Sequence, residues 1–239
     1  MNRSPTRSQW LLWIAALLLF MAVAIVPVSL RLTRIAGLGL ACVVWLGLIF
    51  LTWRRRAIGY GLLGFTVVVI AFLLWPSSPS ATANSLRSQY VANLRHYHGT
   101  RYYWGGETRL GIDCSGLVRR ALIDAFLVDA IRYARPDSAR RALSLWWHDC
   151  SALALSEEYR GLTLPVTKTR SVNALDHSLI LPGDLAVTTN GAHVMAYLGE
   201  QRWIEADPEV GRVITVTAPT TENPWFTAPM TIMRWSVLE

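Results

Sequence analysis

Three long stretches without a charged side chain stand close together at the start of this 239-residue chain and limit what it can fold into. They span residues 10–30, 35–53 and 57–75, and each is at least 19 residues long. At about 1.5 Å per residue, a helix of that length crosses a hydrocarbon core of about 30 Å. A tryptophan stands at one end of each stretch, where indole rings favour the membrane interface. The sequence therefore predicts a membrane anchor of three transmembrane helices within residues 1–75.

The formal net charge of +7 comes entirely from this same region. Residues 1–75 contain seven arginines and neither lysine nor an acidic residue, whereas residues 76–239 carry equal numbers of basic and acidic side chains. Because the larger part of the chain is neutral overall, its charge does not indicate a surface for nucleic acid. We expect no nucleic-acid partner.

The arginines also predict how the three helices cross the membrane. With the N-terminus inside, the cytoplasmic side carries the two arginines of the N-terminal head and the run 54–56. The outer side then carries only Arg31, Arg34 and the more distant Arg87. Short cytoplasmic loops are the ones enriched in arginine, so this orientation is favoured. An odd number of spans places residues 76–239 on the outer face.

Residues 76–84 are small and proline-bearing, which is typical of an extended linker. The first apolar stretch could instead be a signal peptide, since two arginines precede it. Its 21 residues exceed the usual apolar run of about 7–15 residues, however, and two more stretches follow. We therefore expect a permanent anchor, a linker at 76–84 and a second domain at 85–239.

A glycine-rich segment at 105–111 leads into Asp113, Cys114, Ser115 and Gly116. An apolar run with helical spacing follows at once: Leu117, Val118, Ala121, Leu122, Ala125 and Phe126. This pattern places Cys114 at the start of a helix and makes Asp113 its N-cap. The free backbone N–H groups and the helix dipole at such a position favour a reactive thiolate. The alternative is a cysteine that only fills space as a small apolar residue.

A histidine further along the chain supports the reactive interpretation. A turn at 181–184 opens a predicted strand at 185–189, and Asn190-Gly191 predicts a tight hairpin into a second strand that begins at His193. If the helix of Cys114 packs on this sheet, the thiol and the imidazole meet as nucleophile and general base.

The C-terminal half is predicted to consist of strands at 185–189, 193–198, 202–207, 213–218 and 231–235, joined by short turns. Ahead of the cysteine, a helix capped by Asn84 or Ser85 is expected to run to about Tyr97. Helices in the first half that pack on an antiparallel sheet give an α+β domain.

Five short motifs occur in a fixed order. They are Gly-Thr-Arg-Tyr-Tyr-Trp-Gly-Gly at 99–106, Asp-Cys-Ser-Gly-Leu at 113–117, Pro-Gly-Asp-Leu at 182–185, His193-Val194 with Tyr-Leu-Gly at 197–199, and Trp-Ile-Glu-Ala at 203–206. This series resembles the NlpC family of papain-like cysteine peptidases, which cut stem peptides of the bacterial cell wall. The resemblance covers about residues 85–218 and implies a papain-like fold for the second domain.

The resemblance also implies roles for single residues. Cys114 and His193 match the family's nucleophile and base. Tyr102 matches a tyrosine beside the nucleophile that helps to bind substrate or the developing oxyanion. Asp113 and Ser115 match positions that contact the free amine end of the peptide.

The third catalytic position is left open between two acids. A base that alternately takes and gives a proton works best when a polar group holds its other nitrogen. If the loop at 199–201 has three residues, His193 shares a sheet face with Glu205 and Asp207. A two-residue loop moves both acids to the other face. The resemblance favours Glu205, although the family more often has histidine or another polar residue there.

Residues 127–176 are not explained by the resemblance and are predicted to be a helical insertion. One helix, capped by Asp137 or Ser138, should run through Trp146 and Trp147. The insertion either forms a wall of the substrate cleft or only packs on the domain. Within it, Cys150 is expected to be structural, because a disulfide to Cys114 would abolish the proposed chemistry. That chemistry requires neither metal nor cofactor.

These features together predict a multi-pass protein of the bacterial inner membrane whose outer, periplasmic domain is a cysteine peptidase. The predicted partners are membrane lipid and peptidoglycan stem peptides, and the resemblance implies cleavage between γ-linked D-glutamate and a diamino acid. Two alternatives stay open. One is a papain-like amidase or acyltransferase acting on another amide or a lipid, and the other is a wall-binding membrane protein without catalytic activity.

Overall fold

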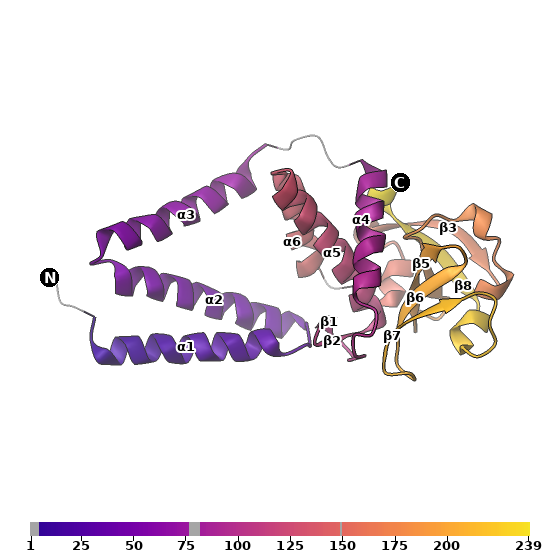
Figure 1. Cartoon of the computed structure of the whole chain (residues 1–239), viewed down its shortest axis with the longest axis horizontal. Coiled ribbons are helices and arrows are strands. Elements are labelled where there is room, and N and C mark those ends of the chain that lie inside the picture. The colour runs from indigo at the N-terminus through magenta and orange to yellow at the C-terminus, as the bar shows by residue number, and fades with distance from the viewer. Residues whose placement is uncertain (1–4, 77–81, 149) are drawn as a thin grey trace.

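The computed structural model describes residues 5–76, 82–148 and 150–239. These residues form a bundle of three long helices and a second part built from shorter helices and a sheet (Figure 1). The predicted basic head and the predicted linker at 76–84 lie partly outside the described residues.

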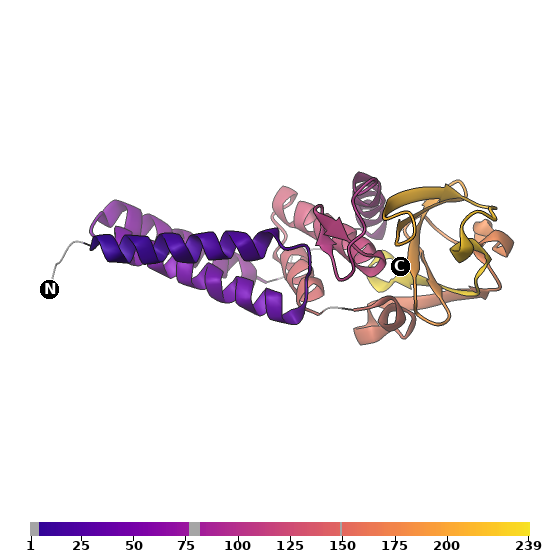
Figure 2. The ribbon, with the colours of Figure 1, turned by 90° about the horizontal axis from the view of Figure 1, so that it is seen from below.

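The three long helices are α1 (Arg7–Ile25), α2 (Arg31–Thr52) and α3 (Arg56–Leu74), and each is long and apolar enough to cross a membrane. Figure 2 shows them side by side. Helix α1 ends five residues earlier than the first predicted span. Proline at position 27 explains the difference, because proline disfavours helical backbone in the residue before it and cannot donate an intrahelical hydrogen bond. The residues that follow are extended and lead to Arg31.

Both ends of the three-helix bundle are recognisable in Figure 1. The N-terminal end of α1 and the turn between α2 and α3 lie far from the second part, whereas the loop between α1 and α2 and the C-terminal end of α3 lie beside it. Helix α6 (Pro136–Trp147) contacts α3 directly. There, a guanidinium nitrogen of Arg140 donates to the carbonyl oxygens of Leu73 and Trp75 at 2.8 and 2.9 Å.

The helices of the second part are α4 (Ala83–His96), α5 (Cys114–Arg132), α6 and α7 (Ala152–Ser156). The caps of two helices differ from those predicted. Helix α4 begins earlier, with Thr82 as the N-cap whose hydroxyl accepts from the Ser85 N–H. Helix α6 begins at Pro136, because proline is favourable in a first helical turn, where no N–H is needed. The N-cap of α6 is Arg135, so none of the four predicted caps is an N-cap: Asn84, Ser85, Asp137 and Ser138.

The main sheet has the strand order β3-β8-β4-β5-β6-β7 and is antiparallel throughout. Its strands are β3 (Thr163–Thr169), β4 (Leu185–Thr188), β5 (Val194–Gly199), β6 (Arg202–Asp207), β7 (Arg212–Thr217) and β8 (Met230–Trp235). Five of these agree with the predicted strands to within about a residue at each end, and β1 (Glu107–Thr108) with β2 (Gly111–Ile112) adds a small hairpin. The prediction of an α+β domain is confirmed.

Strand β3 lies within the segment that was predicted to be wholly helical. Pro165 explains why this strand was not predicted, because a proline inside a short run argues against a strand. The structure accommodates Pro165 at the edge of the sheet, where a bulge between Pro165 and Thr167 interrupts pairing with β8.

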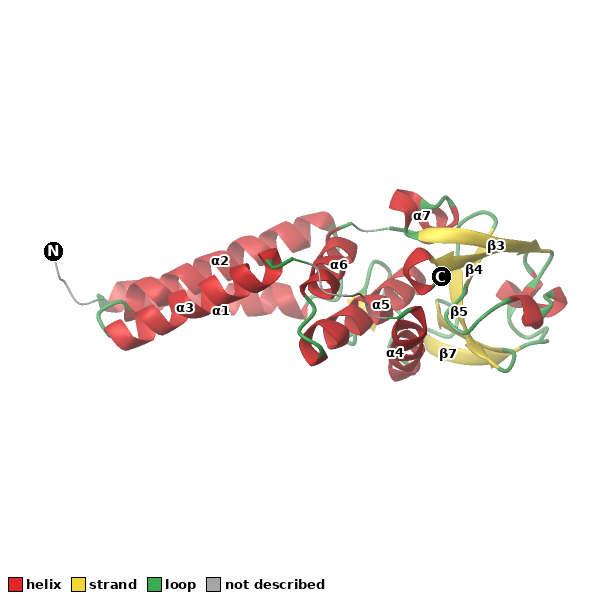
Figure 3. Ribbon diagram, turned by 90° about the horizontal axis from the view of Figure 1, so that it is seen from above, coloured by secondary structure: helices red, strands yellow, loops and turns green. Residues whose placement is uncertain are grey.

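The sheet separates two apolar cores. Helices α4 and α5 cover one face (Figure 3), with Leu94, Leu117 and Leu122 buried against it. The other face buries Trp203 and Phe226 beneath short 3-10 helices. These short helices are η2 (Val172–Ala174), η3 (His177–Leu179) and η4 (Pro224–Thr227). Two others lie on the side of the first core: η1 (Tyr159–Gly161) contacts α7, and η5 (Ser236–Leu238) contacts α4.

The hairpin between β5 and β6 has a two-residue turn, but its strands pair in the register expected for a three-residue loop. Its turn has two residues, Glu200 and Gln201, and both have positive φ angles. A register shift between Tyr197 and Gly199 adds one residue to β5, so that Tyr197 still pairs with Trp203. The strand bodies therefore keep the register expected for a three-residue loop.

Candidate active site

Cys114 is the first residue of α5, as the sequence predicts, and Asp113 is its N-cap. One carboxylate oxygen of Asp113 accepts from the Gly116 N–H at 2.6 Å and from the Ser115 hydroxyl at 3.0 Å. The other accepts from the Gly105 N–H at 2.8 Å. The cap therefore fastens the glycine-rich loop to the helix start, where backbone N–H groups and the dipole favour an anion.

Close contact between this loop and α5 explains one glycine of the motif. The backbone N–H of Asp113 donates to the Gly106 carbonyl oxygen at 3.1 Å. A Cβ atom on Gly116 would lie only 2.1 Å from that same oxygen, so a larger residue would push the loop away. Gly116 thus allows the loop to lie directly against the turn that carries Cys114.

His193 immediately precedes β5 and is almost completely buried, with 1% of its surface exposed. Its backbone N–H donates to the Thr188 hydroxyl at 2.9 Å, and its ring stacks on Trp225 with centroids 4.3 Å apart. Its Nε2 lies 2.5 Å from a carboxylate oxygen of Glu205, and its side chain also hydrogen-bonds Cys114. Because each ring nitrogen serves one hydrogen bond, Nδ1 is the nitrogen left for the thiol.

The pKa of His193 is raised to about 9. Burial is the largest influence and by itself lowers this pKa, because it disfavours the charged ring. Hydrogen bonds to Cys114 and Glu205, together with the negative charges on both, outweigh that effect. The ring is therefore an imidazolium at neutral pH.

The two candidate acids occupy different environments. Glu205 is fully buried, and its second carboxylate oxygen accepts from the Asn223 amide at 2.6 Å. Asp207 instead accepts from the backbone N–H groups of Glu209 and Val210 at 2.7 and 2.8 Å, which closes the turn after β6. Glu205 is thus the acid that bonds the His193 ring.

Tyr102 lies near the thiol, with its backbone N–H donating to the Gly211 carbonyl oxygen at 2.8 Å. The pKa of Tyr102 is raised to about 12, first by burial and then by the negative charges of Cys114, Asp113 and Asp207. Its hydroxyl therefore keeps its proton at neutral pH and can donate a hydrogen bond.

Sequence reasoning missed two residues that surround this cluster, Asn223 and Trp225. Asn223 bonds Glu205, and Trp225 covers one face of His193. The only local signal was an Asn-Pro pair at 223–224, which predicts a turn without indicating what it faces. Their position depends on how the chain returns from β7 to β8 across the second core.

A cavity of about 330 Å³ adjoins the nucleophile helix. Asp113, Ser115 and Gly116 form part of its wall, and Cys150 and Ser151 form another part. The segment between α6 and α7 therefore contributes to this cavity. Neither Cys114 nor His193 lines it, so the two alternatives for residues 127–176 stay open. Three residues of the loop after α1 and of the first turn of α2 also line the cavity: Ser29, Leu30 and Arg34.

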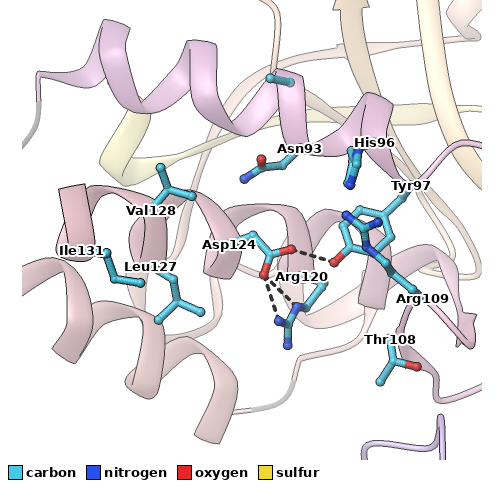
Figure 4. Close-up of a pocket in the computed structure, with 11 residues that line it drawn as sticks. Asn93, His96, Tyr97, Thr108, Arg109, Arg120, Asp124, Leu127, Val128 and Ile131 are labelled. Carbon is cyan, nitrogen blue, oxygen red and sulfur yellow. Dashed lines mark hydrogen bonds and ion pairs between the residues drawn. The ribbon is translucent and has the colours of Figure 1, made fainter.

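A larger cavity, about 710 Å³, is a separate groove between α4 and α5 (Figure 4). Tyr97 and Arg120 both turn toward Asp124 there, and the Tyr97 hydroxyl donates to that carboxylate at 2.6 Å. Leu127, Val128 and Ile131 line the rest. Neither Cys114 nor His193 lines this groove, so its size does not mark it as the reactive site.

Across residues 5–76, 82–148 and 150–239, no group of three or more histidine, cysteine, aspartate or glutamate side chains is arranged to hold a metal ion. The same residues form no disulfide, and Cys150 is buried in the core, as predicted.

The family model described as the NlpC/P60 family matches residues 99–234. Solved structures similar to this chain include the following three. The P60 domain of an antigen from M. avium subspecies paratuberculosis has 17% identity and a TM-score of 0.39, covering 66% of this chain and 98% of that one. The peptidoglycan hydrolase RipB of Mycobacterium tuberculosis has 20% identity and a TM-score of 0.40, covering 64% and 67%. The NlpC/p60 domain of the peptidoglycan hydrolase SagA has 22% identity and a TM-score of 0.35, covering 61% and 97%. No curated protein matches the chain.

Proposed function

Because the chain belongs to the NlpC/P60 family, we propose that it is a membrane-anchored cysteine peptidase that hydrolyses amide bonds in peptidoglycan stem peptides. The observation that carries this proposal is the hydrogen-bonded series of Cys114 at the start of α5, His193 before β5 and Glu205 on β6. A thiol, a proton carrier and an orienting carboxylate in series are what acyl transfer to sulfur requires. A wall-binding protein without catalytic activity would not need them.

In the proposed reaction, the Cys114 sulfur attacks the carbonyl carbon of the scissile amide while His193 holds the proton. His193 then passes that proton to the leaving nitrogen, the C–N bond breaks, and a thioester remains. His193, now neutral, takes a proton from water as the water attacks the thioester, and the released sulfur regains its starting state. Glu205 keeps the ring in place and stabilises its charge throughout.

The negative oxygen that forms during both attacks needs hydrogen-bond donors. Backbone N–H groups at the start of α5 are already oriented, since a first helical turn leaves them without intrahelical partners. The hydroxyl of Tyr102 is the second donor that we propose, because its raised pKa keeps it protonated.

Asp113 and Ser115 are proposed to bind the free amine end of the stem peptide. Both line the cavity beside the nucleophile helix, and a carboxylate there attracts an ammonium group. A peptide bound in this way presents the bond between γ-linked D-glutamate and the following diamino acid to Cys114. This preference is the one that the family resemblance implies.

We propose that residues 1–75 are the anchor, 76–84 a linker and 85–239 the catalytic domain, in a bacterial inner membrane with the catalytic domain on the periplasmic side. The arginine run 54–56 supports this orientation, since it lies at the end of the anchor that is far from the catalytic domain (Figure 1). Cell-wall peptide is found on the same side as the proposed catalytic domain.

The test uses the full chain purified in detergent and incubated with purified stem peptides. The unaltered protein should release new amine ends, and Cys114→Ala should release none. Cys42→Ala is the matched control, because Cys42 is an exposed cysteine on α2, and it should retain full activity. Absence of new amine ends with the unaltered protein would rule the peptidase function out.

One observation favours the alternative of a lipid substrate. An apolar cavity of about 330 Å³ lies between α1 and α2 beneath Trp146, and Ser29 and Arg34 line both this cavity and the one beside Asp113. An acyl chain could occupy the apolar cavity while its amide reaches Cys114. Release of fatty acid from N-acylated lipids in mixed micelles, with no cleavage of stem peptides, would support this alternative over the first.

A further inference from the structure

The outer loop of the anchor, residues 26–30, pairs with the glycine-rich loop that precedes the nucleophile. Val28 and Gly106 form an antiparallel β-bridge. The Ser29 N–H donates to the Gly105 carbonyl oxygen at 2.8 Å, and the Glu107 N–H donates to the Pro27 carbonyl oxygen at 3.2 Å. The anchor therefore adds a short strand-like segment to the catalytic domain, in addition to holding it at the membrane.

A buried ion cluster fixes the same contact. A guanidinium nitrogen of Arg34, on the first turn of α2, lies 3.2 Å from a carboxylate oxygen of Glu107, and Arg119 of α5 lies 3.1 Å from the other oxygen. The Ser29 hydroxyl donates to Glu107 at 3.0 Å and accepts from Arg34 Nε at 2.9 Å. The two arginines and the glutamate are each at most 4% exposed, so water contributes little to their solvation.

Burial makes each charge dependent on the others. A buried ion that loses its partner keeps the cost of leaving water without the attraction that offset it. Arg34 also donates to the Trp147 carbonyl oxygen and lies over the Trp146 ring, so that α2, α6 and the glycine-rich loop all meet at this one side chain.

The glycine-rich loop connects this cluster to the reactive sulfur. On one side, residues 105–107 are held by the anchor loop and Arg34. On the other side, the Gly105 N–H donates to the Asp113 carboxylate and the Gly106 carbonyl oxygen accepts from the Asp113 N–H, at 2.8 and 3.1 Å. Asp113 in turn caps the turn that begins with Cys114.

We propose that the membrane anchor helps to position the catalytic residues. Ser29 and Arg34 act as positioning residues: they hold the 105–107 loop, the loop holds Asp113, and Asp113 sets the place of Cys114 relative to His193. The inference rests on the proposed peptidase function for its activity readout only. Its consequence is that the catalytic domain is fully competent only when the anchor is folded against it.

The experiment uses the full chain in detergent with Arg34→Met, Arg34→Lys and Ser29→Ala. Arg31→Met is the matched control, since Arg31 is exposed on the same first turn of α2. Two readouts are taken: kcat and KM on stem peptides, and the rate at which iodoacetamide alkylates Cys114 as a function of pH, followed by mass spectrometry of the Cys114 peptide. The second readout needs no peptidase substrate.

Displacement of a reacting group by about 1 Å can cost on the order of 100-fold in rate. We therefore expect Arg34→Met to lower both kcat and the alkylation rate by about 10-fold to 100-fold, with KM nearly unchanged. Ser29→Ala should lower both by a smaller factor, Arg34→Lys should recover part of the loss, and Arg31→Met should match the unaltered protein.

Wild-type kcat and alkylation profiles in a folded Arg34→Met protein would overturn the proposal. If Arg34→Met does not fold, Ser29→Ala decides, because it removes one hydroxyl and leaves every charge in place; wild-type profiles in that variant overturn the proposal equally. If stem peptides are not cleaved even by the unaltered protein, the proposed function fails, and the alkylation profiles still decide whether the anchor positions Cys114.

Discussion

Two buried glutamates, Glu205 and Glu107, have contacts of different kinds in the part of the molecule that contains Cys114. Glu205 contacts His193 and Asn223, while Glu107 contacts Arg34 and Arg119. Imidazole gains and loses a proton near physiological pH, whereas guanidinium keeps its charge. The pair at Glu205 can therefore change its charge during a reaction, and the cluster at Glu107 stays ionised. One carboxylate serves a proton carrier, and the other fastens a loop.

The largest expected effect follows from removing the charge of Glu205. Glu205→Gln keeps the size of the side chain but takes away the negative charge that stabilises the His193 imidazolium. We expect kcat on stem peptides to fall by about 10² to 10⁴ fold, with a smaller change in KM. Steady-state kinetics on the full chain in detergent measure this. Retention of more than about a tenth of wild-type kcat would mean that Glu205 is not needed to orient the ring.

The same substitution at the other glutamate should lower stability as well as kcat, because the Glu107 cluster both stabilises the fold and holds the loop that positions Cys114. Glu107→Gln leaves the buried Arg34 and Arg119 without the negative charge with which both pair, which costs roughly 3–5 kcal/mol when a buried pair is broken. A lowered melting temperature in detergent, followed by circular dichroism, is the measurement. Glu222→Gln, at an exposed carboxylate, is the control and should leave the melting temperature unchanged. Equal melting temperatures for both variants would show that the Glu107 cluster does not stabilise the fold.

The comparison also separates what the sequence can predict from what it cannot. The position of Cys114 at a helix start and of His193 at a strand start follows from local signals: a cap before an apolar helical run, and strands with two-residue periodicity. The fold class and five of six main strands follow from the same kinds of signal. Local periodicity left the choice between Glu205 and Asp207 open, because that choice depends on the length of one hairpin loop.

The cluster at Glu107 could not be predicted in this way. Arg34 and Glu107 are 73 positions apart, and in the sequence Arg34 is only a positive charge outside an apolar span. Its burial depends on the anchor folding back onto the catalytic domain, which no short pattern records. Asn223 and Trp225 escaped prediction for a similar reason, since they reach the site through a connection that crosses the second core.

The dependence of activity on pH should also distinguish Glu205 from Glu107. The folded-state pKa of His193 is raised to about 9, so the ring stays protonated below that pH and loses its proton above it. Activity should therefore fall at alkaline pH with a midpoint near the pKa of His193. Glu205→Gln removes one of the causes that raise this pKa, and the alkaline midpoint should move to lower pH. Glu107→Gln should move it less, because it acts on this pKa only through the position of Cys114.

The free energy of unfolding should also decrease as the pH rises, because of the same raised pKa. A group whose pKa is higher in the folded than in the unfolded state stabilises the fold at low pH. For His193 this contribution is complete below its unfolded pKa of about 6.5 and is lost as the pH rises through about 9. Melting temperatures measured between these pH values should fall in the unaltered protein and fall less in Glu205→Gln. If Glu205→Gln left the dependence of melting temperature on pH unchanged, Glu205 would not be a cause of the raised pKa of His193.

The smallest expected effect concerns Asp207, the acid that the sequence could not distinguish from Glu205. Its carboxylate accepts from the backbone of the turn after β6, and Asn223 lies 3.4 Å from its second oxygen. Asp207→Asn keeps an acceptor for the turn, so we expect a loss of about 1 kcal/mol in stability and less than a threefold change in kcat. The alkaline midpoint should stay where it is, because this charge does not contact the His193 ring. If Asp207→Asn instead lowered kcat more than tenfold and moved that midpoint, Asp207 would be the acid that governs His193, and Glu205 would join Glu107 as a carboxylate that only holds structure.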